Sequence, residues 1–484
     1  MKKTLFTCFL CLFVFLLVGC STPEAGYNGF DYYYPGDEMT GDEYQEIVEN
    51  DFTLTADKAT SAMALSASTA SYANLRSAIN EDRAISADQI RIEEMINYFR
   101  FSYQDPTEDE VLSVQSTLIP TPWNDETHLL LIGMKAEDVE LSTVPNNLVF
   151  LIDTSGSMNS ANKLPLVQQS FTLLTEQLKA TDRVSIVTYA GSDTVVLDGA
   201  YGDEKIRINA AINDLYASGS TAGARGLERA YQLAEKHFVS DGNNRVILAT
   251  DGDFNVGIST TSGLENFISE KKNDGVYLSV LGFGYGNYKD NKLETLASKG
   301  NGNHAYIDSI LEARKALITD INGTLLTVAR DAKAQITFNE DVIESYRLIG
   351  YENKMMSDDE FEDSNTDAGE IGAGHQVTIV YEVTCKTTSD NEIGTVLIRY
   401  KSPVVGEEDV IEQSAVLDRS VQGIAEEDAL FITSVVETGL VLRESAFLGS
   451  GSLQGAKLRI QDLDCLDTDE FKQEFYNLII KQMD

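Results

Sequence analysis

The chain has 484 residues, of which 43% are hydrophobic and 9% aromatic, so it can bury the cores of several domains and is not a disordered chain. Its 37 Lys and Arg residues against 77 Asp and Glu residues give a net charge of −40. This balance argues against nucleic acid and against anionic lipid headgroups as partners, because both require a basic surface.

The N-terminus has the pattern of an export signal. Lys2 and Lys3 precede an apolar run from Leu5 to Val18, which is too short to span a bilayer comfortably. The run closes in Leu17-Val18-Gly19-Cys20, which resembles the lipobox of bacterial lipoproteins. The resemblance implies that residues 1–19 are a signal peptide and that Cys20 is lipidated. An ordinary signal peptide with an incidental cysteine is the alternative.

A lipidated Cys20 predicts the location of the protein. Acyl chains on this residue would hold the chain at a membrane surface. We therefore expect an extracytoplasmic protein of the bacterial cell envelope, anchored to the membrane by lipid. Whether that membrane is the inner or the outer one stays open.

Residues 20–60 are predicted to form an acidic, flexible tether. Ten acidic residues and no Lys or Arg lie between Ser21 and Asp57, and no helical or strand period holds there. Repulsion among the acidic side chains would keep such a spacer extended and solvated.

The flanking regions, residues 61–140 and 330–484, are predicted to be rich in β-strands. Helices are expected at the start of the first region and at Ala425–Ser445 and Thr468–Met483. The strands are expected at Val111–Ile119, His128–Gly133 and Gln335–Phe338 and around 377–383 and 396–400. We expect the strands of both regions to form one antiparallel sandwich, into which the middle of the chain is inserted. Whether Cys385 and Cys465 pair stays open.

The middle of the chain, residues 145–325, alternates predicted strands and helices. Apolar runs predict buried strands, and apolar residues at helical spacing predict the helices between them. The strands are expected at Leu148–Ile152, Val184–Val187, Val246–Ala249 and Tyr277–Leu281, and the helices near 164–178, 208–215 and 227–238. This order favours an α/β fold with a doubly wound, mostly parallel sheet, which binds ligands outside the carboxyl ends of its strands.

The motif that carries the chemistry is Asp153-Thr154-Ser155-Gly156-Ser157, directly after the first of these strands. A carboxylate and two hydroxyls stand on alternate residues, and Gly156 lets a tight turn form. Thr221 lies just ahead of the third helix, and Asp251 follows a later strand. Oxygen ligands suit a hard cation rather than zinc. The Asp153 loop could therefore hold a divalent cation, and two further loops offer the Thr221 hydroxyl and the Asp251 carboxylate.

Other interpretations of this motif are weaker. The serines could simply cap a helix after a core strand. Aspartic proteases and haloacid-dehalogenase-type phosphatases also place an aspartate after an apolar strand, but Ser155 stands where the first needs glycine and the second a further aspartate. The glycine-rich segment 282–286 lacks the spacing of a nucleotide-binding loop. We expect that the protein is not an enzyme.

The three loops together are similar to the metal-ion-dependent adhesion site of von Willebrand factor type A domains, a Rossmann-like fold. Asp153, Ser155, Ser157, Thr221 and Asp251 match this site position by position, so the resemblance implies that they bind a divalent cation. Mg²⁺ is expected in the first place, with Ca²⁺ and Mn²⁺ as alternatives. The resemblance also implies that an acidic side chain of a protein partner completes the coordination.

A wider resemblance covers most of the chain. The segments Ala70–Asn74, Arg91–Phe99, Tyr346–Lys354 and Asp367–His375 resemble the flanking regions of a bacterial family of lipoproteins with a von Willebrand factor type A domain. The expected function is cation-dependent binding of a protein partner at a membrane surface. The alternative is a structural envelope component, in which the cation only stabilises the α/β domain.

Overall fold

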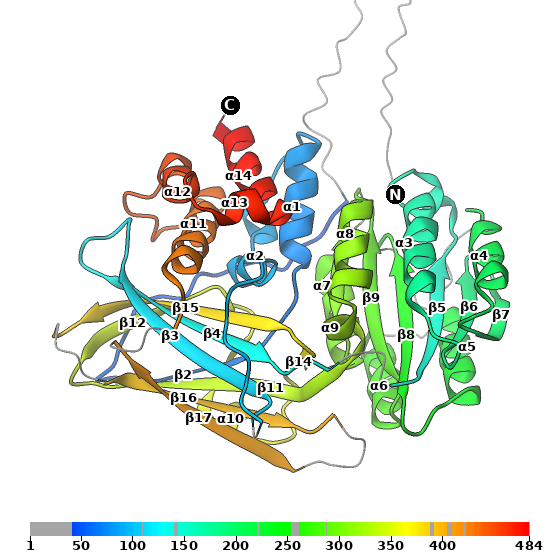
Figure 1. Cartoon of the computed structure of the whole chain (residues 1–484), viewed down its shortest axis with the longest axis horizontal. Helices are drawn as coiled ribbons and strands as arrows, with labels where there is room; N and C mark the ends of the chain where they lie inside the picture. The colour runs from blue at the N-terminus through cyan, green and yellow to red at the C-terminus, as the bar shows by residue number, and fades with distance from the viewer. Residues whose placement is uncertain are drawn as a thin grey trace, which may run out of the picture. The chain divides into compact units, whose positions relative to one another are not determined.

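The computed structural model describes residues 41–108, 110–139, 144–219, 223–252, 261–286, 288–387, 392–403, 409–419 and 423–483. Its elements form an α/β domain and a β-sandwich that carries helices (Figure 1). The predicted lipidation residue Cys20 and the predicted ligand Thr221 lie outside the described residues.

The α/β domain is built on a six-stranded sheet in the order β10-β9-β8-β5-β6-β7. Neighbouring strands are parallel except for the edge strand β7, which is antiparallel to β6. The strands are β5 (Asn146–Asp153), β6 (Arg183–Tyr189), β7 (Asp193–Tyr201), β8 (Asn243–Thr250), β9 (Tyr277–Phe283) and β10 (His304–Ile307). Every residue of β5 and β8 is buried, as central strands covered on both faces require. The predicted doubly wound, mostly parallel sheet is confirmed.

Helices cover both faces of this sheet (Figure 1). One face carries α3 (Leu164–Gln177), α4 (Lys205–Asn213), α8 (Ile310–Arg314), a π-helical turn (Lys315–Thr319) and α9 (Ile321–Leu325). The other face carries α5 (Gly223–Lys236), α6 (Thr261–Asn273) and α7 (Asp290–Lys299). The apolar stripe predicted for α3 packs inward, and Phe171 stacks on Phe150 of β5 with ring centroids 4.2 Å apart.

The β-sandwich consists of two antiparallel sheets, in the orders β1-β12-β15-β4-β3 and β13-β2-β11-β16-β17, with β14 paired to β11. The strands before the α/β domain are β1 (Thr53–Leu54), β2 (Thr60–Ala64), β3 (Leu112–Pro120) and β4 (His128–Ala136). Those after it are β11 (Thr327–Phe338), β12 (Ile343–Ile349), β13 (Met355–Met356), β14 (Gly369–Gly372), β15 (Gln376–Cys385), β16 (Glu392–Lys401) and β17 (Val410–Asp418), with the short helix α10 (Asp358–Glu362) between β13 and β14. Both sheets contain strands from before and after the α/β domain, so that domain is inserted into the sandwich, as predicted.

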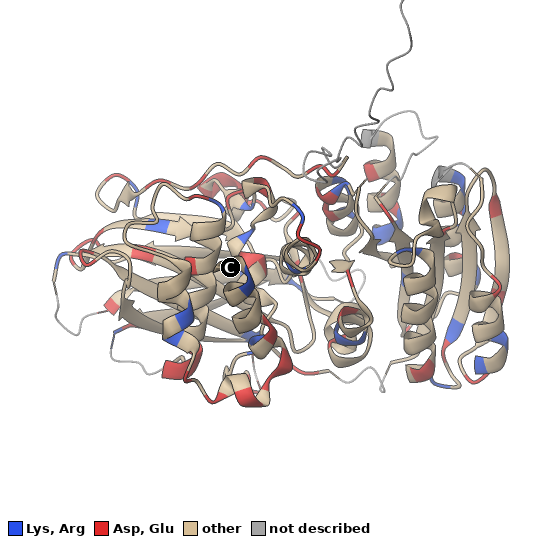
Figure 2. Cartoon of the chain, turned by 90° about the horizontal axis from the view of Figure 1, so that it is seen from above, with Lys and Arg blue, Asp and Glu red and all other residues tan. Residues whose placement is uncertain are grey.

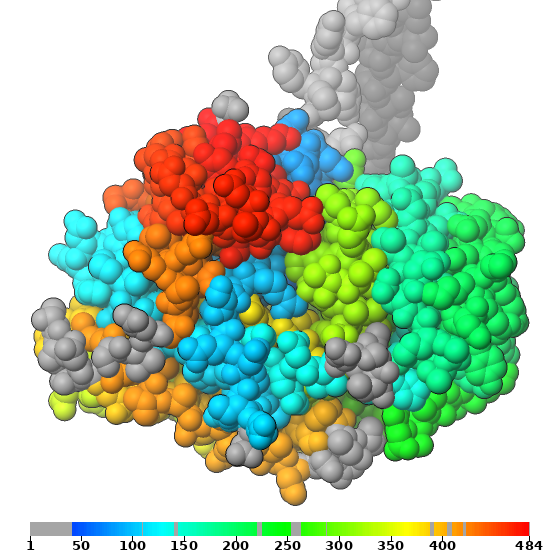
Figure 3. Space-filling view, viewed as in Figure 1, coloured from blue at the N-terminus to red at the C-terminus, as the bar shows by residue number. Residues whose placement is uncertain are grey.

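A layer of helices packs on the outer face of the first sheet. It contains α1 (Ala70–Asn80), α2 (Ile92–Asn97), α11 (Glu426–Leu442), α12 (Leu453–Ile460), α13 (Cys465–Thr468) and α14 (Glu470–Met483). Its apolar core includes Leu129, Leu131 and Val380 from the sheet. The C-terminal helices, red in Figure 3, lie against the N-terminal helical segment, blue in the same view. Within the described ranges, no helix is both long and apolar enough to cross a bilayer.

Residues 41–60 differ from the predicted flexible tether. Strand β1 pairs with β12, and the side chain of Thr55, which is buried, donates a hydrogen bond to the carbonyl of Ile343 at 2.7 Å. The Tyr44 hydroxyl donates to Asn74 of α1 at 2.9 Å. Most of these partners lie hundreds of positions along the chain, so no local periodicity indicates them. The expectation of a solvated spacer does not hold for residues 41–60.

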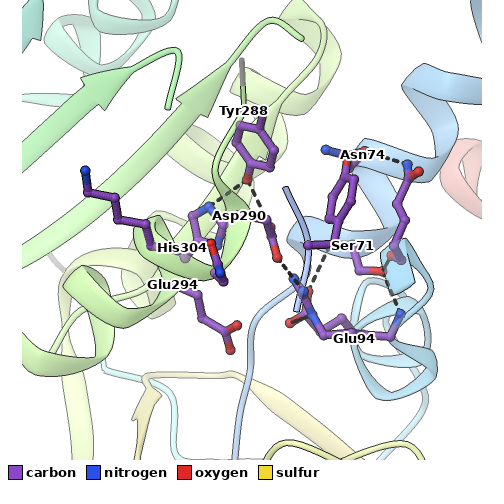
Figure 4. Close-up of polar contacts among 12 residues, drawn as sticks. Ser71, Asn74, Glu94, Tyr288, Asp290, Glu294 and His304 are labelled. Atoms are coloured by element: carbon purple, nitrogen blue, oxygen red, sulfur yellow. Dashed lines mark hydrogen bonds and ion pairs between the residues drawn. The ribbon is translucent and has the colours of Figure 1, made fainter. Parts of the chain in front are cut away.

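A buried network of polar side chains joins the α/β domain to the N-terminal helices (Figure 4). Arg91, just ahead of α2, forms ion pairs with Glu94 at 2.7 Å and with Asp290 at the start of α7. The Tyr288 hydroxyl donates to Asp290 at 3.2 Å and lies 2.8 Å from Nε2 of His304. The α/β domain is therefore attached to this segment through specific, buried polar pairs.

Charged residues are distributed over both parts of the protein. Figure 2 shows Asp and Glu on the α/β domain and on the sandwich, interspersed with Lys and Arg. Acidic residues are therefore not confined to one part of the described structure.

Cys385 and Cys465 are free thiols, so this structure contains no disulfide between them. Cys385 ends β15, and Cys465 begins α13. Both are partly buried, and burial raises the pKa of each thiol. Neither thiol is therefore an activated nucleophile.

Candidate metal centre

The loop after β5 brings three oxygen-bearing side chains together at the carboxyl edge of the sheet. Asp153 is the last residue of β5 and is fully buried. The backbone amide of Ser155 donates to Oδ1 of Asp153 at 2.8 Å, and the hydroxyls of Ser155 and Ser157 lie 3.0 Å apart. A short 3₁₀ helix, Gly156–Asn159, starts within this loop. One carboxylate and two hydroxyls thus converge through local geometry alone.

Strand β8 brings a second carboxylate to the same edge. It runs parallel to β5, with Ile152 opposite Ala249, so the residues that follow each strand are neighbours. The Thr250 hydroxyl donates to Oδ2 of Asp153 at 3.3 Å. Asp251 follows directly, and its side chain is 0% exposed. The sheet register therefore brings the Asp251 loop beside the Asp153 loop, across about a hundred positions of sequence.

Burial dominates the electrostatics of Asp153. It raises the pKa of this carboxyl group from 3.8 to about 6, and the negative charge of Asp251 adds to the effect. Hydrogen bonds from Ser155 act in the opposite direction. Two neighbouring buried carboxylates are costly to ionise together, so this position favours a nearby positive charge.

The third predicted loop packs against the first. The amide of Ser218 donates to the carbonyl of Thr154 at 2.7 Å, and the amide of Gly156 donates to the carbonyl of Gly219 at 3.1 Å. The segment that approaches Thr221 is thus held beside the Asp153 loop as far as residue 219. Because Thr221 lies outside the described residues, its role as a ligand stays a prediction.

The structure adds one residue that the sequence did not indicate. Lys163 directly precedes α3, and its ammonium group donates to Oδ2 of Asp251 at 2.9 Å. The side chain of Lys163 is only 10% exposed. A lone lysine ahead of a helix is not a recognisable motif, and its partner lies 88 positions away.

The donor set fits a hard divalent cation. Asp153 and Asp251 supply negative charge, and Ser155 and Ser157 supply neutral oxygens, which are the ligands that Mg²⁺ and Ca²⁺ prefer. Within the described ranges, this site included, no group of three or more His, Cys, Asp and Glu side chains could hold a metal ion, so the fit rests on two carboxylates and neighbouring hydroxyls. A bound divalent cation would supply a positive charge able to attract an acidic group of another molecule.

Three family models match this chain. The model described as von Willebrand factor type A domain matches residues 147–321. The model described as the C-terminal domain of the uncharacterized protein YfbK matches residues 323–391 and 385–484. A third, described as von Willebrand factor, matches residues 38–131.

The chain is similar in sequence to the uncharacterized protein YfbK of Escherichia coli (strain K12). The two are 37% identical over 463 residues, which cover 90% of this chain and 80% of YfbK. The chain is also 29% identical over 170 residues to the inter-alpha-trypsin inhibitor heavy chain H3 of Bos taurus, covering 34% of this chain and 19% of that protein.

Solved structures of low similarity were also found. A von Willebrand factor type A protein from Catenulispora acidiphila is 17% identical with a TM-score of 0.41, over 78% of this chain and 91% of that one. Proximal thread matrix protein 1 of the mussel byssus, solved with a zinc-occupied metal-ion-dependent adhesion site, is 22% identical with a TM-score of 0.29. It covers 34% of this chain and 42% of that one. These scores are too low for either structure to bear on the site.

Proposed function

This chain belongs to the family of the Escherichia coli protein YfbK, and we propose that it is a membrane-anchored lipoprotein that binds a protein partner through a divalent cation. Its von Willebrand factor type A domain makes protein–protein interaction the general function. The cation, the acidic side chain of the partner and the lipid anchor are the specific parts of the proposal.

One observation carries the proposal. Asp153 and Asp251 meet at the carboxyl edge of the sheet, beside the hydroxyls of Ser155 and Ser157. In open α/β sheets this edge is where ligands bind. Two carboxylates with adjacent hydroxyls have the charge and the oxygen donors for a divalent cation.

The residues would divide the work of binding as follows. Asp153 and Asp251 would offset the charge of the cation, and the serine hydroxyls, together with Thr221, would supply neutral oxygens. Mg²⁺ is the proposed ion, with Ca²⁺ and Mn²⁺ as alternatives. The cation would then give an acidic protein a local positive charge that binds a Glu or Asp side chain of the partner.

Calorimetric titration of the full-length, detergent-solubilised protein with Mg²⁺ and Mn²⁺ tests the cation site. Asp153→Ala should abolish binding because it removes a buried ligand carboxylate. Asp241→Ala is the matched control, since Asp241 is exposed and precedes β8 at the edge of the sheet opposite the site. Equal cation affinity in wild type and Asp153→Ala would refute the proposed site.

Recovery of a partner from solubilised envelope separates binding from a structural role. In the proposed function, the partner is retained with Mg²⁺ and lost with EDTA or Asp153→Ala, while the melting temperature without metal is nearly unchanged by the substitution. If the cation only stabilises the α/β domain, the Asp153→Ala protein unfolds more easily, and partner binding falls only in proportion to the unfolded fraction.

The anchor is tested at Cys20. We propose an extracytoplasmic protein of the cell envelope, held to the membrane by lipid on this cysteine. Cys20→Ala should abolish labelling with a clickable fatty acid and move the protein from the membrane fraction to the soluble fraction. This part of the proposal is contradicted if the wild type takes up no label and Cys20→Ala stays in the membrane fraction.

A further inference from the structure

Lys163 is attached to the candidate metal site by a buried ion pair. Its ammonium group lies 2.9 Å from Oδ2 of Asp251, and the two side chains are 10% and 0% exposed. Asp251 is one of the two carboxylates that face each other at this edge of the sheet. A positive charge of the protein itself therefore lies against a carboxylate proposed to bind the cation.

The backbone around Lys163 holds the side chain in this position. Lys163 directly precedes α3, and the amide of Val167 donates to its carbonyl at 2.9 Å. The aliphatic stem crosses Gly284, the residue after β9, where an added Cβ would lie 2.5 Å from Cε of Lys163. Gly284 has φ of +69°, so the backbone there suits glycine and leaves room for the stem. The ion pair is thus built into the loop after β9 as well as into α3.

The charges at the site explain what this ion pair does. Asp153 and Asp251 are neighbouring buried carboxylates, and the negative charge of each opposes that of the other. The lysine offsets one of these charges, which stabilises the metal-free fold. The charge of Lys163 also weakens the attraction of the site for a divalent cation. In addition, Oδ2 of Asp251 already accepts a hydrogen bond from Lys163.

Starting from the cation site proposed above, we propose that Lys163 is a built-in competitor of the metal for Asp251. Cation binding must break or lengthen the ion pair between Lys163 and Asp251. The lysine thereby sets the cation affinity lower than the four oxygen-bearing side chains would otherwise give. It also keeps the metal-free protein folded, so that binding of the cation is reversible.

The test is a set of Mn²⁺ and Mg²⁺ titrations of the full-length protein by calorimetry, with thermal unfolding in EDTA. Lys163→Met keeps the aliphatic stem and removes the charge. It should bind the cation about tenfold more tightly or better, because the charged hydrogen bond from Lys163 no longer competes for Asp251. In EDTA this variant should also melt at a lower temperature than the wild type. Added metal should raise its melting temperature by more than it raises that of the wild type. Lys163→Gln is the second variant in case Lys163→Met does not fold.

Two controls bracket the result. Lys163→Arg keeps a positive charge at the site and should not tighten cation binding. Lys236→Met removes a charge from the same domain at an exposed ion pair with Asp198, where the lysine side chain is 54% exposed. It should leave cation affinity unchanged.

The outcomes separate this inference from the cation site itself. If Asp153→Ala abolishes binding but Lys163→Met binds no more tightly than wild type, the cation site stands and competition by Lys163 is refuted. Weaker binding in Lys163→Met would also refute it and would make Lys163 a residue that positions Asp251. Cation binding by Lys163→Met but not by the wild type would support the competition. If neither the wild type nor Lys163→Met binds a cation, both proposals fail.

Discussion

The substitution Arg91→Met tests how the α/β domain is attached to the rest of the protein. Arg91 is 3% exposed, and its guanidinium donates to Glu94 at 2.7 and 3.2 Å and pairs with Asp290 of α7. The side chains of Glu94 and Asp290 are 0% and 2% exposed. Methionine is unbranched and apolar, so the variant leaves both buried carboxylates without this partner.

The expected cost follows from this burial. Removing one partner of a buried ion pair costs about 3–5 kcal/mol, because the remaining charge has lost its hydration. The unfolding free energy of a typical native protein is about 5–15 kcal/mol. We therefore expect Arg91→Met to remove at least about 3 kcal/mol, which is a large fraction of the total.

Urea unfolding followed by two signals is the assay. The chain has one tryptophan, Trp123, which is 2% exposed in the core between the sandwich and its helices. Its fluorescence reports on that part, whereas far-UV circular dichroism also reports on the α/β domain. In the wild type the two transitions should coincide. In Arg91→Met both should shift to lower urea, and they should separate because the α/β domain loses a buried attachment.

Arg207→Met is the control for the loss of an arginine charge. Arg207 pairs with Glu204 at 3.0 Å, and its side chain is 56% exposed. A pair of this kind contributes no more than about 1 kcal/mol. If Arg91→Met changes the unfolding free energy no more than this control does, or leaves the two transitions coincident, the reasoning about the network is wrong.

Three further substitutions test other parts of the structure. Burial and two neighbouring carboxylates raise the pKa of Glu93 from 4.5 to about 8. The free energy of unfolding should therefore fall as pH rises between these values, by on the order of a few kcal/mol. Glu93→Gln should remove this fall in urea titrations across the range. A pH dependence equal to that of the wild type would contradict the assignment. Gly284→Ala should cost about 1–3 kcal/mol in thermal unfolding, because of its positive φ and the stem of Lys163; a neutral effect would count against that contact. Asp42→Ala removes a carboxylate that accepts a hydrogen bond from the amide of Gly286 at 2.8 Å, so it should speed hydrogen exchange at that amide. Unchanged exchange would show that this hydrogen bond does not protect the amide.

The parallel sheet and the sandwich were predictable because their strands carry local signals. The run Leu148–Ile152 is apolar throughout because β5 is covered on both faces, which is the signature of a central parallel strand. The alternation around 377–383 marked β15 because a strand presents successive side chains to opposite faces. Strand β1 had no such signal, since Thr53–Leu54 is too short for any period to show.

The candidate site divides in the same way. Asp153, Ser155 and Ser157 lie within five residues, so their convergence follows from the turn that they occupy. Asp251 could be placed at the same edge because parallel strands end on one side of a sheet. Lys163 could not be assigned, since its ion pair with Asp251 depends on where α3 starts and on the absence of a side chain at Gly284.

The sequence alone determined the fold class and the local donor loop, because apolar periodicity and turn chemistry act between residues that are close along the chain. The tertiary structure decided which charges face each other. The pairs of Lys163 with Asp251 and of Arg91 with Asp290 join residues 88 and 199 positions apart, and burial gives them their strength. Neither separation nor burial leaves a pattern in the sequence, because an ion pair is set by the packing of whole elements and not by the spacing of their residues.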